Sequence, residues 1–106
     1  MSYTHIDPRE LVTKLSSLGE DEMIVDVREP HEWEYYHLDE AVLLPMNAIP
    51  GRLDELPSDK TLYVVCAHGV RSEMVSRYLA ERGYDRVVNV TGGMAAVAAI
   101  RGFEYD

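Results

Sequence analysis

The chain has 106 residues, of which 46% are hydrophobic and 27% charged, and its formal net charge at pH 7 is −9. These proportions are typical of an ordinary folded domain and exclude an intrinsically disordered chain. The excess of acidic side chains argues against a nucleic-acid partner, since the phosphate backbone is bound by clustered lysines and arginines. The longest apolar block, residues 94–100, is too short to cross a membrane. We therefore expect one domain, residues 1–106, without a membrane partner.

The N-terminal half alternates short apolar runs with amphipathic stretches. The predicted elements are, in chain order, a strand at 3–6, a helix from residue 7, a strand at 23–27, a helix at 30–37, a strand at 41–45 and helical turns at 49–56. Asp7 is placed to cap the first of these helices, and Pro8 suits its first position. Trp33 lies on the amphipathic 30–37 stretch, so we expect it to pack in the core.

The C-terminal half continues this alternation. Its predicted elements are a strand at 61–66, a helix at 72–83, a strand at 86–90 and a helix at 92–100. The 72–83 helix is expected to bury a face made of Met74, Val75, Tyr78 and Leu79. Because the apolar runs lack polar alternation, their strands should be covered on both faces, as in a parallel sheet. We predict an α/β fold in three layers, with a central, mostly parallel sheet of about five strands flanked by helices.

The only cysteine, Cys66, ends the most apolar predicted strand and precedes a short polar loop. In parallel α/β sheets, the functional crevice lies beyond the carboxyl ends of the strands. A tight loop that leads into a helix turns backbone N–H groups inward, and the helix adds the positive end of its dipole, so such a loop favours an anion. A thiol beneath it should ionise more readily than a free cysteine. The alternative is a small buried residue that ends a core strand, but Gly69 and Arg71 in the loop favour chemistry.

Three motifs, in order along the chain, resemble those of the rhodanese family, sulfurtransferases that carry sulfur as a cysteine persulfide. "CAHGVRS" (66–72) resembles the active-site loop, "VDVREPHEWEYYHLDEAVLLP" (25–45) an upstream signature and "GYDRVVNVTGGMAAV" (83–97) a C-terminal signature. The resemblance implies that Cys66 is the catalytic nucleophile. It also implies a substrate-binding loop that consists of Ala67, His68, Gly69, Val70, Arg71 and Ser72.

The upstream signature carries two further candidates. The resemblance implies that Asp26 and Arg28 support the loop, with Asp26 a possible partner of Arg71. Alternatively, Asp26 is a strand-end carboxylate that caps the next helix.

The loop and the resemblance together predict a sulfurtransferase. It would move a sulfane sulfur from a small anionic donor, such as thiosulfate or a persulfide, to cyanide, a thiol or a protein acceptor. Two alternatives stay open: a non-catalytic sulfur carrier or binding module, and a relative of phosphatases and arsenate reductases. The latter is less favoured, because those loops hold five residues between cysteine and arginine and this one holds four. The four histidines lack metal-ligand spacing, so no metal or cofactor is expected. An unpaired cysteine indicates a reducing compartment, and we expect a cytoplasmic location.

Overall fold

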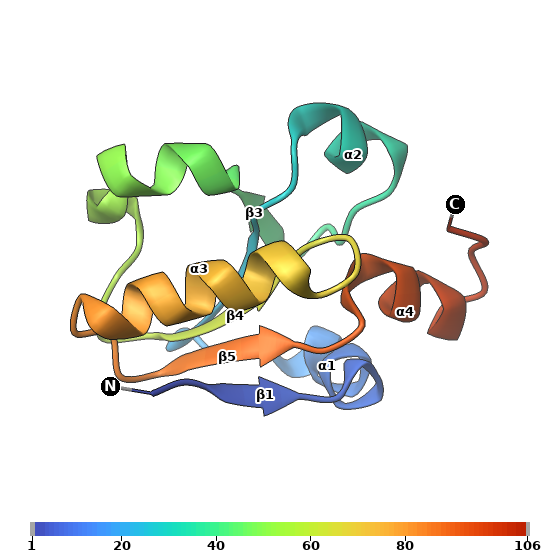
Figure 1. The fold of residues 1–106 in the computed structure, drawn as a ribbon. Coiled ribbons are helices and arrows are strands. Elements are labelled where there is room, and N and C mark those ends of the chain that lie inside the picture. Colours follow the sequence, from blue (N-terminus) through green and yellow to red (C-terminus); the bar gives the residue numbers. More distant parts are fainter. Residues whose placement is uncertain (1, 106) are drawn as a thin grey trace.

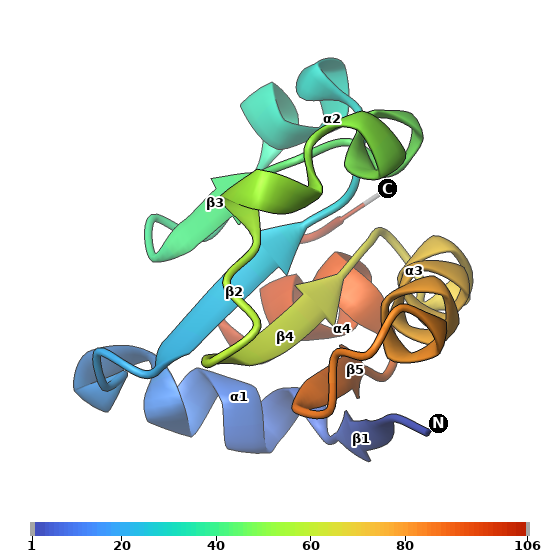
Figure 2. The ribbon, with the colours of Figure 1, turned by 90° about the vertical axis from the view of Figure 1, so that its left-hand side faces the viewer.

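The structure of the protein is a computed structural model, and it describes residues 2–105. Its centre is a five-stranded sheet in the order β1-β5-β4-β2-β3, and Figure 2 shows these strands in succession across the molecule. The strands are β1 (Thr4–Ile6), β2 (Glu22–Asp26), β3 (Ala41–Leu43), β4 (Thr61–Val65) and β5 (Val87–Val90). Every neighbouring pair is parallel, which confirms the predicted sheet. The apolar sequence of β4 agrees with its position at the centre, where both faces are covered.

Three of the four helices connect successive strands, and α4 follows the last strand. The helices are α1 (Pro8–Lys14), α2 (Pro30–Tyr35), α3 (Val70–Glu81) and α4 (Gly93–Ile100), and Figure 1 shows α3 running alongside β5. Asp7 caps α1 as predicted, since its side chain accepts a hydrogen bond from the Arg9 N–H at 2.8 Å. Three short 3₁₀ segments complete the fold: η1 (Leu15–Ser17), η2 (Met46–Gly51) and η3 (Leu53–Glu55). Within residues 2–105, no helix has both the length and the apolarity needed to cross a membrane.

A separate apolar cluster covers each face of the sheet. On one face, α3 packs through Val75 and Leu79 and is joined by Ile49 of η2. On the other face, α1 contributes Leu11 and α4 contributes Met94 and Val97. The sheet is thus the middle of three layers.

Two expectations about packing are wrong, the first of them only at Met74. The predicted face of α3 is buried at Val75 and Leu79, but Met74 is 54% exposed, because the buried face continues through Ser72 and Ser76. Trp33 is only half-buried and stacks on the His37 ring, with ring centroids 4.0 Å apart. The six-residue α2 buries none of its residues against the sheet, so Trp33 finds its partner within its own segment.

Candidate active site

Cys66 follows the carboxyl end of β4 and is only 1% exposed. Its Sγ accepts a hydrogen bond from the backbone N–H of Gly69 at 3.0 Å and lies 3.3 Å from Ser72 Oγ. Gly69 has φ = 105°, a left-handed conformation that glycine adopts without strain, and it forms the N-cap of α3. The next residues, Val70 to Ser72, open the helix, so their N–H groups have no acceptor within it. The sulfur therefore lies beneath a helix N-terminus, where negative charge is favoured.

The N-terminus of α4 fixes the other side of this loop. The Met94 N–H donates to the Cys66 carbonyl at 2.7 Å, and the Ala95 N–H donates to the Ala67 carbonyl at 3.0 Å. Gly93 permits this approach, since a Cβ there would lie 2.5 Å from the Ala67 carbonyl group and 2.6 Å from the Cys66 oxygen. Because the C=O and N–H of a trans peptide point in opposite directions, holding both carbonyls toward α4 turns the following N–H groups away from it. The paired glycines at 92 and 93 were the sequence signal for this contact.

Arg71 pairs with Glu32, a residue that the sequence analysis did not select. Its two terminal nitrogens donate to the two carboxylate oxygens at 2.8 and 2.9 Å. Hydrogen bonding from Arg71 holds the pKa of Glu32 at about 2, well below the ordinary value of 4.5, and the Glu29 N–H adds to this effect. The proposed pairing of Asp26 with Arg71 is therefore wrong. The spacing of Glu29 and Glu32, which form a capping box at the start of α2, was the available signal.

Asp26 binds Arg28 instead. Both side chains are fully buried, and the Arg28 guanidinium donates to the Asp26 carboxylate through Nε at 2.9 Å and Nη2 at 2.7 Å. The same guanidinium donates to the carbonyls of Glu32 and Tyr36 and to the Tyr105 hydroxyl. The alternative role of Asp26 as a helix cap is also wrong, since Glu29 caps α2. Arg28 thus holds the short helix that carries Glu32, and Glu32 in turn holds Arg71.

A hollow of about 500 Å³ lies beside the loop. It is lined by His31, Glu32, Tyr35, Ala67, His68 and Tyr105. His68 is exposed at its rim, with its ring edge-on to the Tyr105 ring at 6.1 Å. Imidazole N–H and tyrosine hydroxyl groups can donate hydrogen bonds to an anionic ligand in this hollow. Across residues 2–105, no group of three or more histidine, cysteine, aspartate or glutamate side chains is arranged to hold a metal ion.

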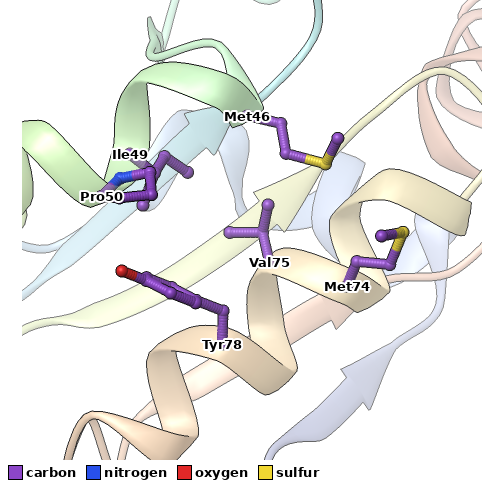
Figure 3. A pocket seen from close by; sticks show the side chains of 6 residues that line it. All are labelled: Met46, Ile49, Pro50, Met74, Val75 and Tyr78. Carbon is purple, nitrogen blue, oxygen red and sulfur yellow. The ribbon is translucent and has the colours of Figure 1, made fainter.

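A second hollow, of about 240 Å³, is apolar. Figure 3 shows that Met74, Val75 and Tyr78 of α3 face the segment of Met46, Ile49 and Pro50. The lining side chains include one hydroxyl and no charged group. The lining of this groove therefore offers no charged partner to a small anion.

The fold and the loop define a class of protein: an α/β domain that presents one buried cysteine between a central parallel strand and a helix N-terminus. The model of the rhodanese-like domain matches residues 7–100, and the chain belongs to this family. A sulfurtransferase of Allochromatium vinosum is 39% identical over 93 residues, which cover 88% of this chain and 86% of the relative. The thiosulfate sulfurtransferase GlpE of Actinobacillus pleuropneumoniae is 32% identical, over 87% of this chain and 83% of its own.

The solved structures agree with the sequence comparison. A rhodanese-like domain protein from Staphylococcus aureus superposes with a TM-score of 0.82 at 40% identity, covering 89% of this chain and 90% of its own. The family and the fold class expected from the three motifs are both confirmed.

Proposed function

We propose that the protein is a sulfurtransferase in which Cys66 accepts a sulfane sulfur and passes it on. The observation that carries the proposal is the position of Cys66 Sγ, 3.0 Å from the Gly69 N–H and beneath the first turn of α3. An anionic sulfur in this position is stabilised by donors that are already oriented, so little reorganisation accompanies the reaction.

The reaction with thiosulfate would take two steps. The Cys66 thiolate attacks the outer sulfur of thiosulfate, a new S–S bond forms, and sulfite leaves with the electron pair of the bond that breaks. The product is a cysteine persulfide anion with its charge on the outer sulfur. Cyanide or another thiolate then attacks this outer sulfur, and the Cys66 thiolate is regenerated as the leaving group. The sulfane sulfur atom is thereby transferred from the donor to the acceptor, and no external oxidant or reductant is required.

The neighbouring residues would have different roles. The substrate-binding loop consists of Ala67, His68, Gly69, Val70, Arg71 and Ser72. The main role of Arg71 is to brace this loop through its ion pair with Glu32. Asp26 and Arg28 support the loop indirectly, by holding α2 in place. The hollow at His31 and His68 receives the anionic donor. The chemistry requires a reduced thiol, which is consistent with a cytoplasmic location.

The spacing within the loop favours sulfur over phosphoryl chemistry. Four residues separate Cys66 from Arg71, whereas the loops of phosphatases and arsenate reductases hold five. A shorter loop leaves a smaller space above the nucleophile, which suits one added sulfur atom better than a tetrahedral oxyanion. A carrier or binding module without turnover would use the same loop, and only the fate of the bound sulfur distinguishes it.

The test is the intact mass of the protein after incubation with thiosulfate, followed by addition of cyanide. We expect a gain of one sulfur atom that cyanide removes as thiocyanate, and no gain in Cys66→Ser. A protein that takes up sulfur but does not release it to cyanide or to thiols is a carrier. A protein that takes up none from thiosulfate or from a small-molecule persulfide contradicts the proposal.

A further inference from the structure

Asn89 is a buried polar residue in the otherwise apolar strand β5. It is 3% exposed and lies between Val88 and Val90. A buried amide without hydrogen-bond partners destabilises the folded state, so both ends of this side chain require partners. Both ends of the amide are paired: Oδ1 accepts from Ser72 Oγ at 2.6 Å, and Nδ2 lies 3.2 Å from His5 Nδ1. His5 is the residue directly opposite Asn89 on β1.

These contacts determine how Ser72 faces the cysteine. An amide nitrogen can only donate, so His5 Nδ1 is the acceptor and the amide oxygen is left for Ser72. The Ser72 hydroxyl has a single hydrogen, and it donates this hydrogen in its hydrogen bond to Asn89. The oxygen therefore offers a lone pair to Cys66 Sγ, 3.3 Å away, and this accepts the S–H of a neutral thiol.

We propose that Asn89 is a positioning residue that favours the neutral thiol of Cys66 by withholding the Ser72 hydrogen from the sulfur. A thiolate has no hydrogen to donate and is stabilised only by donors. For Ser72 to donate to it, the hydroxyl must turn away from Asn89 and leave the buried Oδ1 without a partner. Asn89 thus opposes the Gly69 N–H, which favours the thiolate. The inference deepens the proposed function, because it concerns the pH at which the nucleophile becomes active.

Asn89→Leu and Ser72→Ala leave the surrounding charged and titratable groups unchanged, whereas Asn89→Asp adds a carboxylate and His5→Ala removes an imidazole. The loop side carries Arg71, Glu32, His68 and Tyr105, and the far side of Asn89 carries His5, Tyr3 and Glu73. The elements β5 and α4, which pack against the loop, contain no titratable side chain. A hollow of about 260 Å³, lined in part by His5, Asn89 and Gly69, gives water access to the His5 end of this network.

The experiment measures alkylation of Cys66 by iodoacetamide against pH, with each protein checked by circular dichroism. Cys66 is the only thiol, so the midpoint of the rate reports its ionisation directly. Asn89→Leu removes the acceptor with little change of size, and the freed Ser72 hydroxyl should lower the midpoint by about 1 pH unit, a tenfold change in ionisation. Asn89→Asp adds a negative charge and a stronger acceptor and should raise it.

Two further variants separate positioning from general damage. In a Ser72→Ala background, Asn89→Leu should no longer move the midpoint, since no hydroxyl remains to redirect. His5 is exposed at the edge of the sheet, and His5→Ala should lower the midpoint by a smaller amount. Without the imidazole acceptor, the Asn89 amide can flip and point its nitrogen toward Ser72. A midpoint that does not fall in Asn89→Leu, or that falls equally without the Ser72 hydroxyl, overturns the inference. If Asn89→Leu does not fold, an unchanged midpoint in both His5→Ala and Asn89→Asp also overturns the inference.

This readout does not depend on sulfur transfer. A protein that shows the shifts but takes up sulfur neither from thiosulfate nor from a small-molecule persulfide refutes the proposed function and leaves the role of Asn89 standing. A protein that turns over but shows no shifts refutes only the role of Asn89.

Discussion

Replacing Gly93 with alanine should be among the most damaging single-methyl additions that this chain can receive. The new Cβ would lie 2.5 Å from the carbonyl carbon and oxygen of Ala67 and 2.6 Å from the Cys66 oxygen. All three are backbone atoms, so no side chain can rotate to relieve the contact. Gly93 also has φ = 64°, where alanine is strained.

The magnitude follows from three contributions. A left-handed conformation costs a residue other than glycine about 1–2 kcal/mol. Overpacking that forces the backbone to shift costs about 1–3 kcal/mol. Displacement of α4 also weakens the hydrogen bonds from Met94 and Ala95 to the loop carbonyls, each contributing about 1 kcal/mol. We expect Gly93→Ala to lower the free energy of unfolding by about 4 kcal/mol, out of about 5–15 kcal/mol for a typical domain.

The assay is thermal and urea unfolding monitored by circular dichroism, with Gly83→Ala as the matched control. Gly83 also has a positive φ, 95°, but a Cβ there meets no atom within 4 Å. The control should therefore show the backbone strain alone, about 1 kcal/mol and a Tm lower by about 5 °C. Gly93→Ala should lower Tm by about 15 °C or more. Equal losses in the two variants would refute the reasoning, since the close approach of α4 to the loop would then have no energetic weight.

Three further predictions concern charged residues, of which Glu32 and Arg71 lie at the site and Glu22 begins β2. Glu32→Gln should lower the free energy of unfolding by about 1–2 kcal/mol, measured by urea unfolding, because a partly buried bidentate ion pair loses its negative charge. A loss equal to that of Glu55→Gln, in a more exposed pair, would contradict this. Folding depresses the pKa of both Glu22 and Glu32 to about 2, so the stabilisation that these two carboxylates contribute should be complete above a pH of about 4.5 and should be lost as the pH falls toward 2. Glu22→Gln should remove part of that loss in urea titrations at each pH. Arg71→Lys should lose turnover and Tm almost as much as Arg71→Ala, because one ammonium cannot replace two parallel N–H donors, and a fully active, fully stable Arg71→Ala protein would exclude any bracing role.

The features that depend on short-range sequence patterns could be predicted from the sequence. The apolar strand before Cys66, the cap at Asp7 and the strand–helix alternation each depend on neighbours within a few residues, and they place the cysteine at the carboxyl edge of the sheet. The helix after the loop begins at Val70, before the predicted residue 72, because Gly69 takes the cap position in a left-handed conformation.

The partners of the site residues could not be predicted in the same way. Arg71 meets Glu32 from another element, and which of several nearby carboxylates it pairs with depends on where α2 rests. That position is set by Arg28, whose contacts reach from Asp26 to Tyr105. In the sequence, Asn89 is a single polar residue within an apolar strand. Its contacts with His5 of β1 and Ser72 of α3 are visible only in the folded structure.

The pairing of β1 with β5 also has a consequence for the order of folding. Thr4 lies opposite Val88, so the first strand of the chain docks on the last one. During synthesis the ribosome releases β1 long before β5 exists, and this strand must wait without its hydrogen-bonding partner. Contacts between segments so distant in sequence form slowly, because bringing the two ends of a long loop together costs chain entropy before the contact stabilises the fold. Docking of β1 is therefore expected as a late event in biogenesis, and it is the step in which His5 reaches Asn89.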